Sequence, residues 1–367
     1  MKKLISLLLT LVLVLAIAPS CTINKTEVSV LWSNYKDEYL FTIADAFDRG
    51  AYIENIKHVD YDAENSASKQ LEQADTVIAN GCTALVVNPV DAVTATQLLS
   101  KAKEANLPIL FLCSDALSDA AIKTALAIES YDKCALVNVD ASTCAEVLSK
   151  KIVDDLAKNL KSYDRNGDNT ITYLPLGAGA TAIANAVIEA AKANDTLKNI
   201  TITMADISLL DAALSAGDFA QLVKNLFSDW TEESKVPFEL IISDSDTHVE
   251  SVLLALRGVR EKGFNYKELK THFIPFYTVG ISTNASKLLI NDRPGAEIEQ
   301  EELDAYSVMN TIDSGYVSAS ALVDDDAIAL STAAILRNLI TGKDLMNGVI
   351  AEYVSGNTVS VPYTIYG

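Results

Sequence analysis

Short apolar runs alternate along this chain with longer stretches in which apolar residues recur at helical spacing. The runs are rich in β-branched and aromatic residues, as in "TALVVNP" at 83–89. Ten runs are predicted as strands: 27–32, 52–59, 83–89, 108–113, 134–140, 170–176, 199–206, 238–244, 273–279 and 317–323. Continuous apolar strands that alternate with helices predict parallel sheets covered on both faces.

The intervening segments have the ends expected of helices. The stretch 66–81 begins with Ser66, a residue type that caps helix N-termini, and ends at Gly81, a common helix stop. Ten strands are many for one such sheet in a chain of 367 residues, which predicts an α/β protein with two lobes. The acidic stretch 292–304 breaks the alternation and is predicted as a surface insertion.

The first twenty residues are predicted to be a signal peptide, 1–20. Lys2 and Lys3 precede an apolar run at 4–18, which is short for a membrane span and typical of a signal-peptide core. The sequence "APSC" then resembles a bacterial lipobox. It predicts cleavage before Cys21 and an exported protein lipid-anchored to the cell membrane, facing the periplasm or cell exterior. Cleavage after Ala18, which would release a soluble secreted protein, remains the alternative.

Composition narrows the class of partner. Asp and Glu number 49 against 29 Lys and Arg, a formal charge of −20, and such a surface repels the phosphates of nucleic acid.

No sequence pattern of a hydrolase, zinc protease or phosphate-binding loop is present, and no catalytic residue is predicted. The histidines have no Cys or Asp at a ligand spacing and are predicted to be ordinary. The disulfide state of the remaining cysteines stays open: Cys82, Cys113, Cys134 and Cys144.

Carboxylates gather just after predicted strands. They are Asp37 after the first strand, Asp244 and Asp246 after 238–244, and Asp324 at the start of an acidic triplet after 317–323. Ligands of open α/β sheets bind outside the carboxyl ends of the strands, so these residues are candidate ligand acceptors. Capping of the following helices is the alternative role.

The sequence "GAGATA" at 177–182 also follows a strand and opens a helix. With Asp206 at the end of the next strand it matches a dinucleotide-binding fingerprint, in which Gly177 and Gly179 let the backbone approach a pyrophosphate. The motif follows the sixth of the ten predicted strands, and the protein is predicted to be exported. Both observations argue against dinucleotide binding. An exported nucleotide-dependent enzyme is retained as an alternative.

The segment "YDRNGDNTITYLPLG" at 163–177 begins like a calcium loop. Oxygen-bearing side chains alternate, and the loop's twelfth position, which should supply a bidentate Glu, holds Pro175. The loop alone is therefore either a solvated turn or a site completed from elsewhere. Its candidate ligands are Asp164, Asn166, Asp168, Thr170 and Thr172.

The order of these segments resembles the periplasmic galactose/glucose-binding proteins, type I solute receptors of ABC transporters. The resemblance covers nearly all of the chain after Cys21 and includes "NSASKQLEQADTVIANGCTALVVNPVDAVTA", "SYDK", the calcium-loop segment and "VSVPYT". It implies two lobes, 27–138 with 325–350 and 141–322 with 357–367. It also implies a small ligand between them, most simply a monosaccharide, and an ABC permease or membrane sensor as partner. A receptor for a non-sugar ligand, or a sensory receptor, shares this fold and stays open.

The resemblance also supplies the missing calcium ligand. In this family a Glu from another strand closes the loop, and the matching residue is Glu239. Thr170 would contribute its carbonyl oxygen, and Thr172 takes the place of a family Gln.

The sugar site is matched less well. Asp37 and Tyr39 match an acid and one stacking ring, whereas the second ring falls at Leu210. The family's His, Asp and Arg would lie within 180–187, "ATAIANAV", which has none of them. The resemblance therefore predicts weak binding of galactose and glucose.

Overall fold

The computed structural model describes residues 27–112, 130–164, 166–205, 238–246, 248–249, 274–280, 312 and 317–367. Its strands are β1 (Glu27–Trp32), β2 (Lys57–Asp62), β3 (Ala84–Val87), β4 (Ile109–Leu112), β5 (Cys134–Asp140), β6 (Thr170–Leu176), β7 (Thr201–Met204), β8 (Leu240–Ser243), β9 (Phe276–Val279), β10 (Ala319–Val323), β11 (Val354–Ser355) and β12 (Thr358–Tyr366). The helices are α2 (Glu38–Ile53), α3 (Ala67–Ala79), α4 (Ala92–Glu104), α6 (Ser142–Lys158), α7 (Leu160–Tyr163), α8 (Ala180–Lys192), α14 (Asp325–Thr341) and the 3-10 turn η6 (Ala351–Tyr353).

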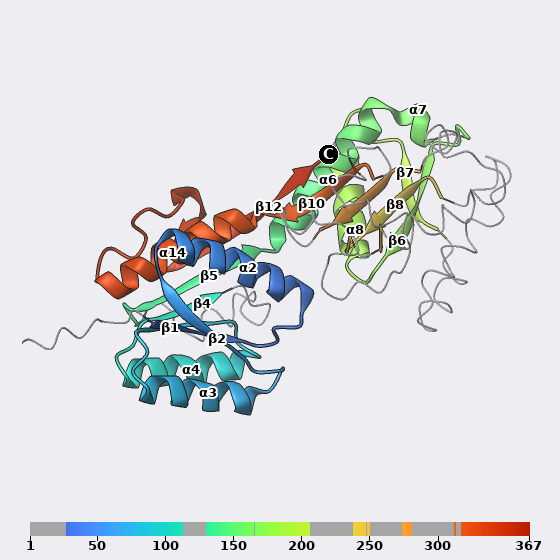
Figure 1. Cartoon of the computed structure of the whole chain (residues 1–367). Coiled ribbons are helices and arrows are strands. Elements are labelled where there is room, and N and C mark those ends of the chain that lie inside the picture. Colours follow the sequence, from blue (N-terminus) through green and yellow to red (C-terminus); the bar gives the residue numbers. More distant parts are fainter. Residues whose placement is uncertain are drawn as a thin grey trace, which may run out of the picture.

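The strands follow the order β2-β1-β3-β4-β5-β12-β10-β9-β8-β6-β7, with β11 paired to β12. We call β2-β1-β3-β4-β5 the first half and β10-β9-β8-β6-β7 the second half; all neighbours within each half are parallel. Figure 1 shows these halves as two groups of elements side by side. The mixed α/β class and the mostly parallel sheet confirm the predicted fold.

Each half has its own apolar core. In the first half, α2 and α14 cover one face of the sheet and α3 and α4 cover the other (Figure 1). In the second half, α6 and α8 pack on β6, β8 and β9. Strands such as β3, buried at every residue, follow from continuous apolar runs with helices on both sides.

Helices α2 and α14 approach unusually closely. A Cβ placed on Gly50 would lie 2.5 Å from the carbonyl oxygen of Ala329, so this contact requires glycine. Two ion pairs flank it, Arg49 with Asp325 at 3.0 Å and Arg337 with Glu54 at 2.8 Å. The N-terminal helix of the first half is thereby joined to a segment almost three hundred residues later in the chain.

Strand β12 belongs to both halves. Residues 358–362 pair parallel with β5, and residues 363–366 pair antiparallel with β10. The predicted lobe boundaries assigned the whole of 357–367 to the second lobe, whereas Val359 and Val361 lie in the core of the first half. The sequence analysis did not predict this strand. Its apolar residues do alternate, but Pro362 lies within the run, and a proline inside a run argues against a strand.

The predicted strand at 52–59 is wrong in its position. Tyr52 and Ile53 end α2, and the strand β2 begins only at Lys57. The helix stops at Asn55, which has a left-handed φ of 54°, and the amide of Ile56 donates to the carbonyl of Ala51 at 2.8 Å. This is a Schellman stop with Asn in place of the usual Gly, which is why the sequence signal was missed.

Cys82, Cys134 and Cys144 are free thiols, and Cys113 lies outside the described residues. Burial raises the pKa of the Cys134 thiol to about 12 and that of Cys144 to about 11. Both therefore stay protonated and unreactive at neutral pH.

Candidate functional site

A buried amide network fixes the carboxyl ends of the first strands. Ser33 Oγ donates to Asn88 Oδ1 at 2.5 Å, and Asn88 Nδ2 donates to the carbonyl of Leu112 at 3.1 Å. Gln70 Nε2 donates to the carbonyls of Leu31 and Asn88 at 3.2 and 2.8 Å. The network links β1, β3 and β4 at the edge where ligands of such sheets bind. The sequence analysis did not single out these residues, although Asn88 follows an apolar strand directly.

Two of the predicted ligand carboxylates cap helices. Asp37 Oδ1 accepts from the amide of Leu40 at 3.0 Å at the start of α2. Asp324 Oδ1 accepts from the amide of Ala327 at 2.9 Å at the start of α14. The alternative role weighed for these residues is therefore realised, and each still has an oxygen able to accept a ligand hydroxyl. The side chain of Tyr39 lies outside the described residues.

Asp244 lies against the glycine turn at the start of α8. Its Oδ2 accepts from the amide of Gly179 at 2.6 Å, and a Cβ placed on Gly177 would fall 1.7 Å from its Oδ1. The space that a dinucleotide fingerprint reserves for a phosphate is thus filled by a carboxylate of this chain. A nucleotide would have to displace it against charge repulsion, so the nucleotide alternative gains no support. Asp206 lies outside the described residues.

The neighbouring His248 and Asp246 complete this corner of the second half. His248 Nδ1 lies 2.7 Å from Ser243 Oγ and 3.8 Å from Asp244 Oδ1. Burial lowers the pKa of His248, against the opposing charges of Asp244 and Asp246. Asp246, a predicted ligand residue, is fully buried. It is therefore better placed to support this corner than to meet a ligand directly.

Substituting Gly177 tests how firmly Asp244 is held. We expect Gly177→Ala to lower the free energy of unfolding by more than about 1 kcal/mol, because its φ of 88° strains any other residue and the methyl group meets Asp244. Gly81→Ala is the matched control, since Gly81 has a φ of 79° and open space around it. Denaturant unfolding of both variants separates strain from collision. Equal losses would mean that the Asp244 carboxylate turns aside freely.

The predicted calcium loop is folded by its own side chains. Asp164 accepts from the amides of Asp168 and Asn169 at 3.0 and 3.1 Å. Asn166 Oδ1 accepts from the amide of Asp168 at 3.0 Å, and Asp168 Oδ1 accepts from that of Thr170 at 2.7 Å. Asn169, sixth in the loop counted from Asp164, has a φ of 63°. Calcium loops place their sharp turn at this sixth position.

Glu239 meets this loop from a segment far away in the sequence. Its Oε2 accepts from the amide of Thr172 at 2.8 Å, and its own amide donates to the carbonyl of Thr172 at 2.7 Å. The structure thus places Glu239 beside the start of β6, where the resemblance puts the closing ligand. The oxygens of Asp164, Asp168 and Glu239 are not all within 4.8 Å of one another. The donor set is all oxygen, which suits calcium.

Two tyrosines that the sequence analysis did not single out anchor the loop. Tyr163 precedes Asp164, and its hydroxyl lies 2.9 Å from that of Tyr277 on β9. The Tyr277 hydroxyl donates to Asp155 Oδ2 on α6 at 2.8 Å. Burial raises the pKa of both tyrosines, so they remain hydrogen-bonding phenols at all physiological pH values. The loop is therefore tied to the core by the residue that directly precedes it.

The fold places candidate ligand residues at strand-to-helix junctions, and comparison with known proteins gives the family. Residues 28–344 match the model of the family described as "Periplasmic binding protein domain", and the chain belongs to that family. This confirms the family predicted from the sequence.

Two curated relatives are similar to this chain. The D-galactose/methyl-galactoside binding periplasmic protein MglB of Haemophilus influenzae is 26% identical over 243 residues, which cover 64% of this chain and 68% of that protein. The ribose import binding protein RbsB of Bacillus subtilis is 27% identical over 122 residues, covering 30% of this chain and 40% of that protein.

Solved structures show the same fold. A solute-binding protein of an ABC transporter from Bacillus halodurans, bound to myo-inositol, superposes with a TM-score of 0.53 at 16% identity, covering 95% of this chain and 96% of that one. The binding protein of the arabinose transporter from a Shewanella species, bound to arabinofuranose, gives 0.52 at 13% identity, covering 93% and 91%. Identities this low establish the fold alone.

Proposed function

We propose that this protein is a sugar-binding receptor of an ABC transporter, which holds a monosaccharide between two lobes and presents it to a permease or membrane sensor. The similarity to the galactoside-binding relative over most of both chains carries the proposal. Asp37, Asp244 and Asp324 support it, because each places carboxylate oxygens at a strand-to-helix junction. Such oxygens accept hydrogen bonds from sugar hydroxyls. Binding and release, without bond chemistry, is the whole activity.

Identifying what co-purifies with the protein tests this proposal. The protein is purified without a denaturing step, and released small molecules are identified by mass spectrometry. Calorimetry then measures their binding, with pentoses, hexoses and inositol compared in parallel. A released monosaccharide that rebinds supports the proposal. A non-sugar ligand, with no sugar bound in the panel, would replace it by the alternative receptor.

The lobes that close on the ligand are proposed to be 27–138 with 325–350 and 141–322 with 357–367. The separate apolar cores of the two halves support this division. Strand β12 is an exception to this division, because its residues 358–362 pair with β5 of the first half.

The calcium ion is proposed as a structural part of the second half. Asp164, Asn166, Asp168 and Glu239 would hold it by their side chains, with Thr170 through its carbonyl and Thr172 beside them. The curled loop, the left-handed Asn169 and the nearby Glu239 support this. Bound calcium would supply charge that joins the loop to the strand pair β6–β8.

Export and lipid attachment are proposed from the N-terminal sequence and from the family's periplasmic location. None of the described helices has the length and apolar character needed to cross a bilayer. In this proposal Cys21 becomes the lipid-modified N-terminus. Two or three acyl chains would attach it stably to the membrane, where one chain would not.

Substituting Cys21 should remove the lipid. We expect fatty-acid label to be incorporated into the wild-type protein in a bacterial host and to be absent from Cys21→Ser, because serine offers no thiol for acylation. Cys82→Ser, which changes another free cysteine, is the control and should keep the label. Label persisting on Cys21→Ser would refute the anchor.

A further inference from the structure

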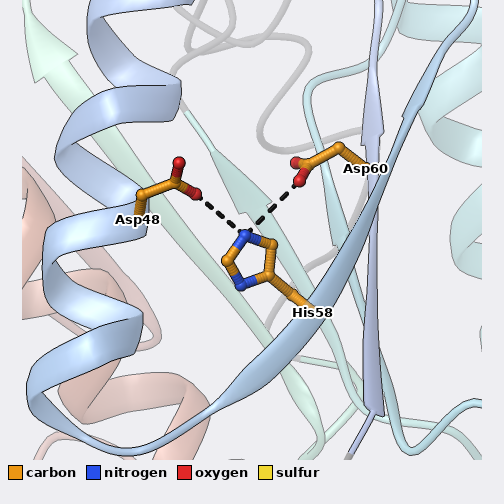
Figure 2. A group of neighbouring side chains, drawn as sticks. All are labelled: Asp48, His58 and Asp60. Atoms are coloured by element: carbon orange, nitrogen blue, oxygen red, sulfur yellow. Dashed lines mark hydrogen bonds and ion pairs between the residues drawn. The ribbon is translucent and has the colours of Figure 1, made fainter.

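Three side chains with metal-binding atoms meet on the first half, away from the calcium loop (Figure 2). His58 Nε2 lies 2.8 Å from Asp48 Oδ1 and 3.4 Å from Asp60 Oδ2. The three atoms all lie within 4.8 Å of one another, and among the described residues this is the one such group of His, Cys, Asp or Glu. Asp48 comes from α2, while His58 and Asp60 come from β2, so the group bridges a helix and an edge strand.

The surroundings hold two of these side chains in place. Trp32, fully buried, donates from Nε1 to Asp60 Oδ1 at 2.7 Å, which leaves Asp60 Oδ2 directed at His58. The Phe47 ring packs edge-on against the imidazole at 5.0 Å between ring centres. Metal ligands are commonly oriented in this way by a hydrogen bond to the far oxygen or by packing of the ring.

The local charge favours a cation. With a neutral imidazole the group carries two negative charges, and Asp45 lies one turn earlier on α2. Burial raises the pKa of the nearby Tyr35, and the charges of Asp60, Asp48 and Asp45 raise it further. Arg49, the adjacent cation on α2, is occupied by Asp45, Asp325 and Asp326.

We propose that Asp48, His58 and Asp60 form a site for a divalent transition-metal ion, with Zn²⁺ the best match. The ligand atoms would be Asp48 Oδ1, His58 Nε2 and Asp60 Oδ2, with water in the fourth position. Zinc bonds of about 2.0–2.1 Å in a tetrahedron set ligand atoms about 3.3 Å apart. The observed 2.8 and 3.4 Å lie within about half an ångström of that spacing. One nitrogen among oxygens suits zinc rather than calcium.

Without a metal the same atoms form an ion-paired clasp. Hydrogen bonds to Asp48 and then to Asp60 raise the pKa of His58 to about 9, against the effect of desolvation. Zinc and this proton compete for the same lone pair on Nε2, so binding at neutral pH releases one proton. The ion would then fasten α2 to β2 by coordination instead of by charge pairing.

Zinc titration of the full chain tests the site. The protein is stripped with chelator and reloaded with calcium, and zinc binding is measured by calorimetry and by metal analysis of the washed protein. We expect one zinc per wild-type chain and at least about tenfold weaker binding in His58→Gln and in Asp48→Asn, each of which removes one ligand. Asp195→Asn removes the same charge at a fully exposed position of the second half and should bind zinc like the wild type.

Two further measurements keep the outcome clear. Cobalt in place of zinc should give the visible absorption of a tetrahedral site in the wild type and lose it in His58→Gln. Circular dichroism and the calcium-induced thermal shift check that each variant is folded, and Asp48, which is half exposed, is the safer of the two substitutions. Equal zinc binding by the wild type, His58→Gln and Asp48→Asn, or no zinc uptake by the wild type, would leave only an ion-paired clasp and overturn the proposal.

Discussion

Galactose and glucose should bind this protein several orders of magnitude more weakly than they bind the receptors whose sequences it resembles. The resemblance puts a His, an Asp and an Arg of the sugar site in 180–187, and this chain has apolar residues, one Thr and one Asn there. Each hydrogen bond to a charged group contributes roughly 1.5–3 kcal/mol. Three such losses amount to about 4.5–9 kcal/mol. Since each tenfold change in affinity corresponds to about 1.4 kcal/mol, they lower the affinity for these sugars by several orders of magnitude.

The structure strengthens this expectation. Residues 180–187 form the first turns of α8, where Ala180, Ile183, Ala184 and Val187 are buried in the core of the second half. Residues 180–187 contain no acidic or basic side chain, so shifting the sequence match within this stretch recovers no Arg, His or Asp. Asp244, which reaches the start of α8 from the end of β8, places a carboxylate there.

Calorimetry of the calcium-loaded protein decides the question, with galactose and glucose measured beside other sugars and nucleosides. We expect another ligand in the panel, less polar on the side that faces α8, to bind more tightly than either hexose. Submicromolar binding of galactose or glucose would contradict the prediction. Asp244→Asn and Asp324→Asn would then show whether these carboxylates hold the hydroxyls.

Removing calcium should destabilise the protein by about 2.7 kcal/mol relative to a calcium concentration one hundred times the dissociation constant. The reason is linkage: an ion that binds only the folded chain adds its binding free energy to folding. Glu239→Gln should abolish most of the calcium-dependent rise in melting temperature. Its amide oxygen can still accept from Thr172, so the substitution removes the charge while keeping that hydrogen bond.

Glu189→Gln is the matched control, because it makes the same chemical change at an exposed position on α8. It should leave the calcium shift intact. Thermal unfolding is followed with calcium and with chelator for the three proteins. If chelator leaves the melting temperature of the wild type unchanged, the loop is a turn and the ion plays no structural part.

Local patterns in the sequence predicted the strands well. Strands β1, β5 and β6 begin and end at the predicted residues, because each is a run rich in apolar and β-branched residues. Errors arose where the signal depends on context, as with the Asn at the end of α2 and the Pro within β12. The end of α2 is a local stop that uses Asn55 where Gly is usual, whereas β12 is specified by its pairing with β5 and β10, which a local pattern does not contain.

The sequence predicted the candidate calcium site better than it predicted the group of Asp48, His58 and Asp60. The calcium loop has its own spacing, but Glu239 lies 67 residues beyond Thr172 and came only from the family resemblance. His58 was predicted to be an ordinary histidine with no Asp at a ligand spacing, whereas its Nε2 lies close to Asp48 and Asp60. The signal was partly present, because His58 and Asp60 two residues apart on a strand share a face. Asp48, ten residues earlier on a helix, reaches them only through the packing of α2 on β2.

Strand β12 also constrains the order in which this chain can fold. Its partner β5 lies more than two hundred residues earlier in the sequence. Its other partner, β10, is much nearer, because β10 directly precedes α14 and only a short segment follows that helix before β12. During synthesis from the N-terminus, both halves can begin to collapse around their local contacts before residues 358–366 exist. The shared strand that joins them is therefore added late, across the longest loop closure of the sheet, and this closure is the natural slow step of assembly.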